Sequence, residues 1–178
     1  TQLKMLYCNT NHSCAIVYNL LQIASERQAD IIFSTKPHQY KRTTHFEGNN
    51  DGTRAAILLN RSIPHTTHPT GYPNIAAIRI NNHVLMVTYA SSNEALPPLL
   101  DHLTLFLQAI HAPVILCGDF NCSTALIPGY TTNARGEEFE NFFTINNLSV
   151  GNSPEPTWHR GALEGIKYYF CCRLFHKA

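Results

Sequence analysis

Charge is scarce in this sequence, and neither sign prevails. Of its 178 residues 14% are charged, and 13 Lys and Arg against 12 Asp and Glu leave a formal net charge of +1. Proteins that bind nucleic acid non-specifically usually have a larger net positive charge, because neutralisation of the phosphates supplies much of their affinity. The overall charge therefore gives no evidence for a nucleic-acid partner, although it leaves room for a local basic patch.

Long apolar runs and metal-binding cysteine spacings are also missing. No apolar stretch reaches the ~18 residues of a membrane span, so we expect no membrane contact. The first residues show no charged leader followed by an apolar segment, so we expect no secretory signal. Cys117 and Cys122 flank Gly-Asp-Phe-Asn, and Cys171 and Cys172 are adjacent, which is not the spacing of a zinc site. These features predict reduced thiols and an intracellular protein.

The sequence does contain alternating strand-like and helical patterns in one stretch of domain size, residues 1–178. A hydrophobic share of 44% is enough for a well-filled core. The predicted strands are 3–8, 30–34, 54–60, 74–80, 83–90, 113–117, 147–150, 156–159 and 166–172, and the predicted helices are 12–28, 94–110 and 135–146. Residues 36–52 are polar and irregular, as in a loop that serves a site. This order predicts an α/β fold of two mixed sheets with helices on the outside.

The sharpest chemical signal is Gly118-Asp119-Phe120-Asn121, which follows an apolar strand. Gly118 permits a sharp turn. In an extended segment, residues two apart point to the same side, so the Asp119 carboxylate and the Asn121 carboxamide are expected to converge. The tetrapeptide resembles the signature of the exonuclease/endonuclease/phosphatase superfamily, in which the Asp activates water and the Asn steadies the phosphate.

The flanking segments resemble one branch of that superfamily, the endonuclease domain of non-LTR retrotransposons. The resemblance lies in three stretches: Tyr7 to Ser13, Val87 to Ser91, and Asn133 to Trp158 with its Arg-Gly, its Asn and its Pro-Thr-Trp. It implies a catalytic set at the strand ends: Asn9, Tyr89, Asp119, Asn121 and Thr157. Three members have a second interpretation, because Asn9 suits a helix cap, Tyr89 suits a core and Thr157 suits any strand.

The sequence departs from that branch where the resemblance implies acidic residues. Lys36 stands before Pro37 at the position of the metal-ligating Glu, and Lys167 follows Ile166 at the position of a supporting Asp. The closing Ser-Asp-His that the resemblance implies is absent, so we expect the domain to be truncated or altered after about residue 169, with its last strands affected. Each exchange of an acid for lysine reverses the local charge, and Mg²⁺ requires hard anionic ligands.

The substitutions change the expected function. We expect no bound metal and no cofactor, with Mg²⁺ only if the domain is an active nuclease. Positively charged side chains could instead bind an anion of the size of phosphate. The candidate residues are Lys36, Lys167, Lys41 and Arg42.

Three functions stay open: a module that has lost cleavage and binds nucleic acid or a protein, an active Mg²⁺-dependent DNA-nicking endonuclease, and a structural subunit. The first implies weak nucleic-acid binding, a partner or second copy at the C-terminal end, and a nuclear location if the domain is retrotransposon-like.

Overall fold

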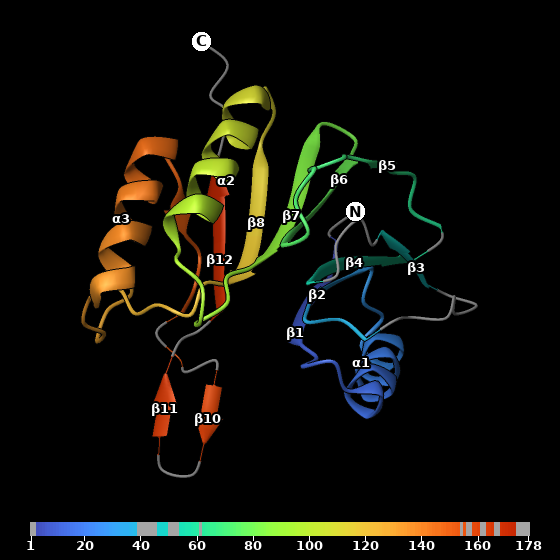
Figure 1. Ribbon diagram of the computed structural model, residues 1–178. Helices are drawn as coiled ribbons and strands as arrows, with labels where there is room; N and C mark the ends of the chain where they lie inside the picture. The colour runs from blue at the N-terminus through green and yellow to red at the C-terminus, as the bar shows by residue number, and fades with distance from the viewer. Residues whose placement is uncertain are drawn as a thin grey trace. The chain divides into compact units, whose positions relative to one another are not determined.

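The computed structural model describes residues 3–38, 46–49, 54–60, 62–153, 155, 158–160, 163–165 and 168–173. Residues 46–49, 158–160, 163–165 and 168 are described by their backbone alone. The chain divides into two compact units, Thr1–Tyr89 and Ala90–Ala178, which we call the N-terminal and the C-terminal unit (Figure 1). Within the described ranges, no helix is long and apolar enough to cross a membrane.

The N-terminal unit combines one helix with two groups of strands. Its elements are β1 (Met5–Asn9), α1 (Cys14–Glu26), β2 (Ile31–Thr35), β3 (Phe46–Asn49), β4 (Ala55–Asn60), β5 (Thr66–Thr67), β6 (Ile75–Ile80) and β7 (His83–Tyr89). A mixed sheet has the order β1-β2-β4-β3, in which β1 and β2 are parallel. The strands β5, β6 and β7 pair antiparallel.

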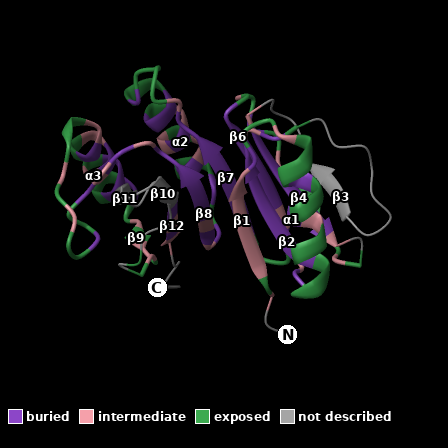
Figure 2. Ribbon diagram, turned by 90° about the horizontal axis from the view of Figure 1, so that it is seen from below, coloured by how far each residue is buried: buried purple, intermediate pink, exposed green. Residues whose placement is uncertain are grey.

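Strand β2 is buried along its whole length because it is covered on both faces. On one face Ile32 packs with Leu20 and Ala24 of α1. On the other side β2 lies against β7, and β4 lies against β6 and β7. Figure 2 shows the result, a buried sheet beneath a helix whose outer face is exposed. A strand covered on both faces needs a continuous apolar run, which explains the sequence around Ile31.

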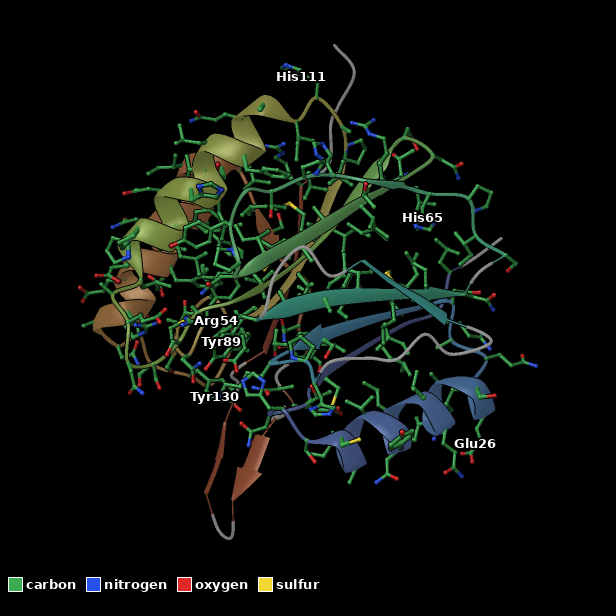
Figure 3. The ribbon with its side chains drawn as sticks, turned by 45° about the vertical axis from the view of Figure 1, so that its right-hand side comes forward. Glu26, Arg54, His65, Tyr89, His111 and Tyr130 are labelled. Atoms are coloured by element: carbon green, nitrogen blue, oxygen red, sulfur yellow. The ribbon has the colours of Figure 1, made fainter. Side chains whose placement is uncertain are left out.

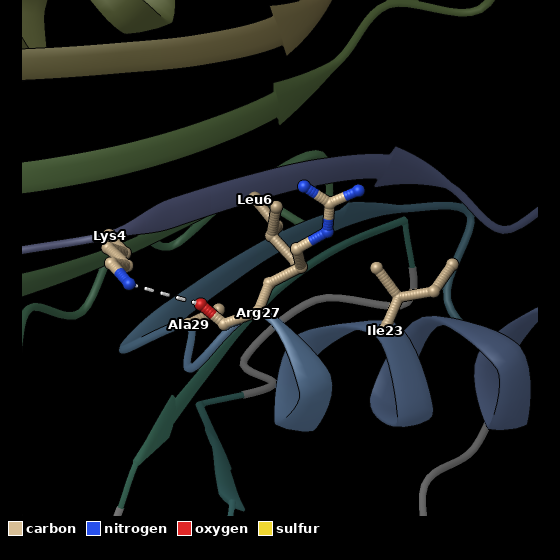
Figure 4. A pocket seen from close by; sticks show the side chains of 5 residues that line it. All are labelled: Lys4, Leu6, Ile23, Arg27 and Ala29. Carbon is tan, nitrogen blue, oxygen red and sulfur yellow. Dashed lines mark hydrogen bonds between the residues drawn. The ribbon is translucent and has the colours of Figure 1, made fainter.

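Both ends of α1 have identifiable caps. The Ser13 hydroxyl oxygen accepts a hydrogen bond from the N–H of Ile16 at 3.4 Å, which makes Ser13 the N-cap. At the other end, Lys4 Nζ donates to the carbonyl of Arg27 at 3.4 Å, where a cation suits the helix dipole. These two residues border a surface pocket of about 470 Å³ with Leu6, Ile23 and Ala29 (Figure 4). Lys4 therefore has a structural role at this pocket.

The C-terminal unit packs two helices beside a group of antiparallel strands. Its elements are α2 (Pro97–Ala109), β8 (Val114–Asp119), α3 (Ala134–Asn146), β9 (Ser149–Val150), β10 (Trp158–Arg160), β11 (Leu163–Gly165) and β12 (Tyr168–Arg173). Strand β12 pairs antiparallel with β8 and with β9, while β10 and β11 form a hairpin. Helix α2 packs on α3. The core is aromatic, with the Phe139 ring 4.6 Å from Phe120 and 4.7 Å from Tyr169 between centroids.

The three predicted helices and most predicted strands are confirmed, and four details differ. Strand β3 lies inside the segment 36–52 that was predicted to be irregular, and the short strands β5 and β11 were not predicted. Strand β8 continues through Gly118 and Asp119 instead of ending at Gly118. The predicted turn at Gly118 is therefore wrong. The chain turns at Asn121, whose φ is 47°.

Candidate functional site

The turn after β1 is fastened to the end of β2 by buried hydrogen bonds. Thr10 is fully buried, its N–H donates to the Thr35 carbonyl at 2.9 Å, and its hydroxyl donates to the Lys36 carbonyl at 2.8 Å. The N–H of His12 donates to the same Lys36 carbonyl at 2.8 Å. The polar residues at these two strand ends therefore have fixed backbones.

Asn9 closes β1 with a local turn and does not cap the helix. Its Oδ1 accepts the N–H of Asn11 at 3.0 Å, which is the geometry of an Asx turn. Ser13 provides the helix cap instead. The capping interpretation of Asn9 is therefore wrong, and its side chain lies half-buried at the carboxyl end of β1.

Lys36 has a left-handed backbone that its neighbours hold in place. Its φ is 47°, a region that lysine seldom occupies. Its N–H donates to the Arg54 carbonyl at 2.9 Å, and its own carbonyl accepts the bonds from Thr10 and His12. A conformation that costs about 1–3 kcal/mol persists only where the surroundings determine it, as they do here.

The Lys36 side chain is directed by one aromatic ring and one amide. Its Nζ lies 5.1 Å from the centroid of the Tyr89 ring, and it donates to Asn11 Oδ1 at 3.5 Å. Tyr89 ends β7 and is 6% exposed, so its face offers a largely desolvated platform for a cation. Figure 3 labels Tyr89 and Arg54, the two residues whose ring and carbonyl Lys36 contacts.

Asp119 and Asn121 lie together in the C-terminal unit, but through a different geometry from the one predicted. Asp119 is 2% exposed, and its carboxylate Oδ1 accepts the N–H of Asn121 at 3.2 Å. Asn121 is left-handed, so the two side chains do not follow the alternation of an extended strand. Asn121 Nδ2 donates to the Ala90 carbonyl at 2.9 Å, and the N–H of Ala90 donates to the Asp119 carbonyl at 2.8 Å. The Asp–Asn pair is thus closed by a ring of hydrogen bonds through Ala90.

One residue of this site was not identified as functional from the sequence. Arg135, in the first turn of α3, donates from its guanidinium to the carbonyls of Glu94, Ser91 and Phe120. The sequence pattern indicated only that the Arg-Gly pair opens a helix. The acceptors of Arg135 lie 15 to 44 positions away in the sequence, so no local sequence pattern predicts these contacts.

Four predicted site residues lie outside the described residues, and so does part of the predicted C-terminal interface. Thr157, Lys167, Lys41 and Arg42 are not described, and neither are Leu174 and Phe175. The C-terminal interface was predicted to involve Phe170, Leu174 and Phe175, and of these Phe170 is described and is half-buried.

The buried sulfur and phenol groups near Asp119 are held in their protonated forms. Burial raises the pKa of the Cys122 thiol to about 12, against a lowering by the Tyr169 hydrogen bond. Burial also raises the pKa of Tyr169, whose hydroxyl donates to the Cys122 carbonyl at 2.9 Å. Neither group supplies a nucleophile near neutral pH, because the reactive forms are the thiolate and the phenolate.

Magnesium is the metal that the family resemblance implies, and the described donors of the N-terminal unit do not fit it. The described polar side chains linked to the Lys36–Tyr89 pair include the amide of Asn11, bonded to the Lys36 ammonium, and the amide of Asn74, bonded to the Tyr89 carbonyl, whereas Mg²⁺ binds through carboxylates. A protonated amine has no lone pair to offer. In the described part of the chain, no group of three or more His, Cys, Asp or Glu residues has a metal-binding arrangement.

Comparisons with known proteins agree with this architecture. Residues 83–166 match the protein family described as Endonuclease-reverse transcriptase. The endonuclease domain of TRAS1, a telomere-specific non-LTR retrotransposon, has a TM-score of 0.83 at 19% identity, over 96% of this chain and 85% of that chain. A humanised D. rerio TDP2 carrying 14 mutations has a TM-score of 0.64 at 15% identity, over 99% of this chain and 85% of that chain. No curated protein sequence matches the chain.

The structural matches identify the fold of the domain. The chain has the exonuclease/endonuclease/phosphatase fold, with mixed sheets and outer helices as predicted. The predicted resemblance to the endonuclease domains of non-LTR retrotransposons is confirmed as a likeness in fold to one such domain, and as a family match over residues 83–166.

Proposed function

We propose that this retrotransposon-endonuclease-like domain binds the phosphate groups of nucleic acid and does not cleave them. The observation that supports the proposal most is the placement of Lys36. A fixed backbone, a buried aromatic face and an amide oxygen direct its ammonium. A cation held in one place binds an anion at a lower entropic cost than a freely moving surface lysine.

The proposed phosphate-binding set consists of Lys36, Lys167, Lys41 and Arg42. Binding by point charges without a metal is weak and falls with salt, because each phosphate contact releases condensed counterions. We propose Asn9, Tyr89, Asp119, Asn121 and Thr157 as the remains of a catalytic site. No metal-dependent step is part of this function, since Lys36 carries the wrong charge for a cation ligand.

The Asp119–Asn121 pair favours a second candidate, an active magnesium-dependent nicking endonuclease. The pair retains a carboxylate and a carboxamide in one hydrogen-bonded arrangement. Phosphodiester hydrolysis also needs charge stabilisation and an activated water, which a bound metal supplies in enzymes of this chemistry. The lysine at position 36 is the feature that makes binding without cleavage the better-supported function.

The decisive experiment measures binding and cleavage on the same protein. Fluorescence anisotropy with a labelled oligonucleotide at low salt gives the affinity, and a supercoiled plasmid with Mg²⁺ reports nicking. We expect Lys36→Met to weaken binding about tenfold and to lower the salt slope by about one counterion. Lys36→Glu is expected to abolish binding without producing cleavage. Lys4→Met is the matched control, because Lys4 is an exposed lysine of the same unit that caps α1.

Two results would redirect the conclusion. An oligonucleotide affinity that does not change in Lys36→Met or Lys36→Glu contradicts phosphate binding and supports a structural subunit. Magnesium-dependent nicking that disappears in Asp119→Ala establishes the active endonuclease.

The proposal extends to a protein contact at the C-terminal end and to a nuclear location. Strand β12 lies between β8 and β9, but its Phe170 is only half-buried, and an incompletely covered apolar face is normally protected. A partner chain or a second copy would supply that cover. Light scattering during size-exclusion chromatography tests the second copy, and a strictly monomeric protein at high concentration contradicts it.

A further inference from the structure

The guanidinium of Arg135 joins two segments of the C-terminal unit that flank the Asp119–Asn121 pair. Nη1 donates to the Glu94 carbonyl at 2.7 Å, and Nη2 donates at 3.2 Å to each of the Ser91 and Phe120 carbonyls. Phe120 lies between Asp119 and Asn121. Ser91 follows Ala90, whose carbonyl accepts the Asn121 side chain.

The start of α3 leaves Arg135 little freedom to place its charge elsewhere. Asn133 Oδ1 accepts the N–H of Gly136 at 2.8 Å and the N–H of Ser123 at 3.3 Å, which ties the helix start to the segment after Asn121. A Cβ atom at Gly136 would collide with the Ser123 carbonyl. The helix therefore approaches this segment as closely as glycine allows, and the Arg135 backbone is fixed against it.

Burying the Arg135 guanidinium among backbone carbonyls carries an energetic cost. The three carbonyls that accept these bonds are neutral groups, so they do not cancel the charge of the guanidinium. Arg135 Nε is buried and has no hydrogen-bond partner in the described part of the chain. Burying a polar N–H without a partner costs about 1–3 kcal/mol.

We infer that Arg135 is a positioning residue for Asn121. It holds the carbonyl that precedes Asn121 and the segment that carries the acceptor of its side chain. Asn121 is thereby fixed in its left-handed conformation from both sides. The expected effect of Arg135 on ligand binding rests on the proposed function. The positioning of Asn121 does not, because it is measurable without ligand.

Arg173, the last residue of β12, provides a control of matched chemistry beside the first residue of β8. Its Nη2 donates to the carbonyls of Leu107 and Ile110 at 2.9 and 3.0 Å. Arg173 pairs with Val114, the first residue of β8, whereas Asp119 is the last. Both arginines thus tie a helix end or loop to the sheet, but only Arg135 contacts the Asp–Asn segment.

The test compares Arg135→Met and Arg135→Lys with Arg173→Met and Arg173→Lys. Urea denaturation gives the loss of stability, and NMR gives hydrogen exchange at the Ala90 amide and at the Asn121 side-chain amide. We expect exchange at both groups to accelerate at least about tenfold in Arg135→Met, beyond what its lost stability explains. Arg135→Lys should be intermediate, because an ammonium can reach some of the three carbonyls but does not match the fork of the guanidinium. The Arg173 variants should alter exchange only in proportion to their stability.

Oligonucleotide affinity in the same variants separates this inference from the proposed function. If Arg135→Lys weakens binding while Arg173→Lys does not, both are supported. If the wild-type chain binds no oligonucleotide but the two amides exchange faster in Arg135→Lys, the proposed function fails and the positioning role stands. The inference is overturned if amide hydrogen exchange at Ala90 and Asn121 is equally fast in Arg135 and Arg173 variants of equal stability. If Arg135→Met does not fold, the two lysine variants alone provide this comparison.

Discussion

The ammonium of Lys36 lies 5.1 Å from the centroid of the Tyr89 ring, so the cation at the end of β2 is placed by an aromatic residue at the end of β7. The ring therefore directs the side chain of Lys36, which stands where the resemblance implies a metal ligand. Substitutions at Lys36 and at Tyr89 can test the contributions of the charge and of the ring independently.

Tyr89→Phe and Tyr89→Leu separate the ring from the hydroxyl. We expect Tyr89→Phe to keep oligonucleotide affinity within about twofold of the wild type, because the ring face that contacts Lys36 remains. Tyr89→Leu should weaken binding by about three- to tenfold, since it removes that face. Anisotropy titrations at low salt measure both. Equal affinities in the two variants would show that Lys36 needs no aromatic partner.

Gly136→Ala should be among the most destabilising alanine substitutions in the C-terminal unit. The added Cβ meets a backbone carbonyl, that of Ser123, which cannot move aside without breaking the Asn133 hydrogen bonds. We expect a loss of about 3 kcal/mol in the free energy of unfolding, measured with urea. Gly151→Ala is the comparison, because its Cβ meets a side-chain atom of Phe170 at 3.0 Å and that ring can shift. A cost for Gly136→Ala below that of Gly151→Ala would contradict this packing.

Acid stability should depend on Glu140. Hydrogen bonds from the Thr124 and Thr132 hydroxyls lower the pKa of Glu140 below its usual 4.5. A carboxylate with a lowered folded-state pKa contributes stability that is present above pH 4.5 and is lost as the pH falls through the folded-state value. We therefore expect Glu140→Gln to flatten the decline of unfolding free energy below about pH 4.5. Glu137→Gln, on the exposed face of the same helix, is the control.

Thiol modification should distinguish exposed from buried cysteines. Cys14 is exposed, whereas Cys117, Cys122 and Cys171 are buried, and burial raises the pKa of all three buried thiols. We expect a thiol reagent at neutral pH to modify Cys14 rapidly and the three buried cysteines only after unfolding. Mass spectrometry of digested protein assigns the sites, and Cys14→Ser should remove the fast phase. Rapid labelling of Cys117 or Cys171 in native protein would contradict the described core.

The periodic parts of the fold are predictable from the sequence because burial imposes the pattern. The apolar run at Ile31 predicts a buried strand, and the spacing of Leu100, Leu103 and Leu107 predicts the buried face of α2. Strand β3 escaped prediction because Phe46–Asn49 shows neither alternation nor an apolar run, and its strand character depends on pairing with β4.

The identities of the site residues are readable from the sequence, but their conformations are not. The Gly-Asp-Phe-Asn motif indicates that Asp119 and Asn121 belong together. The turn at Asn121 instead of Gly118 depends on partners 31 and 15 positions away, Ala90 and Arg135. The left-handed backbone of Lys36 likewise depends on Thr10, His12 and Arg54, none of which is a sequence neighbour.

The left-handed backbone of Lys36 has a consequence for engineering. Asparagine or glycine accepts a φ of 47° at a lower cost than lysine, and the backbone bonds to Arg54 and His12 do not require the side chain. Lys36→Asn and Lys36→Gly should therefore raise the free energy of unfolding while they remove the cation. Position 36 is then a point of trade-off, where a more stable protein is obtained by giving up affinity for anions.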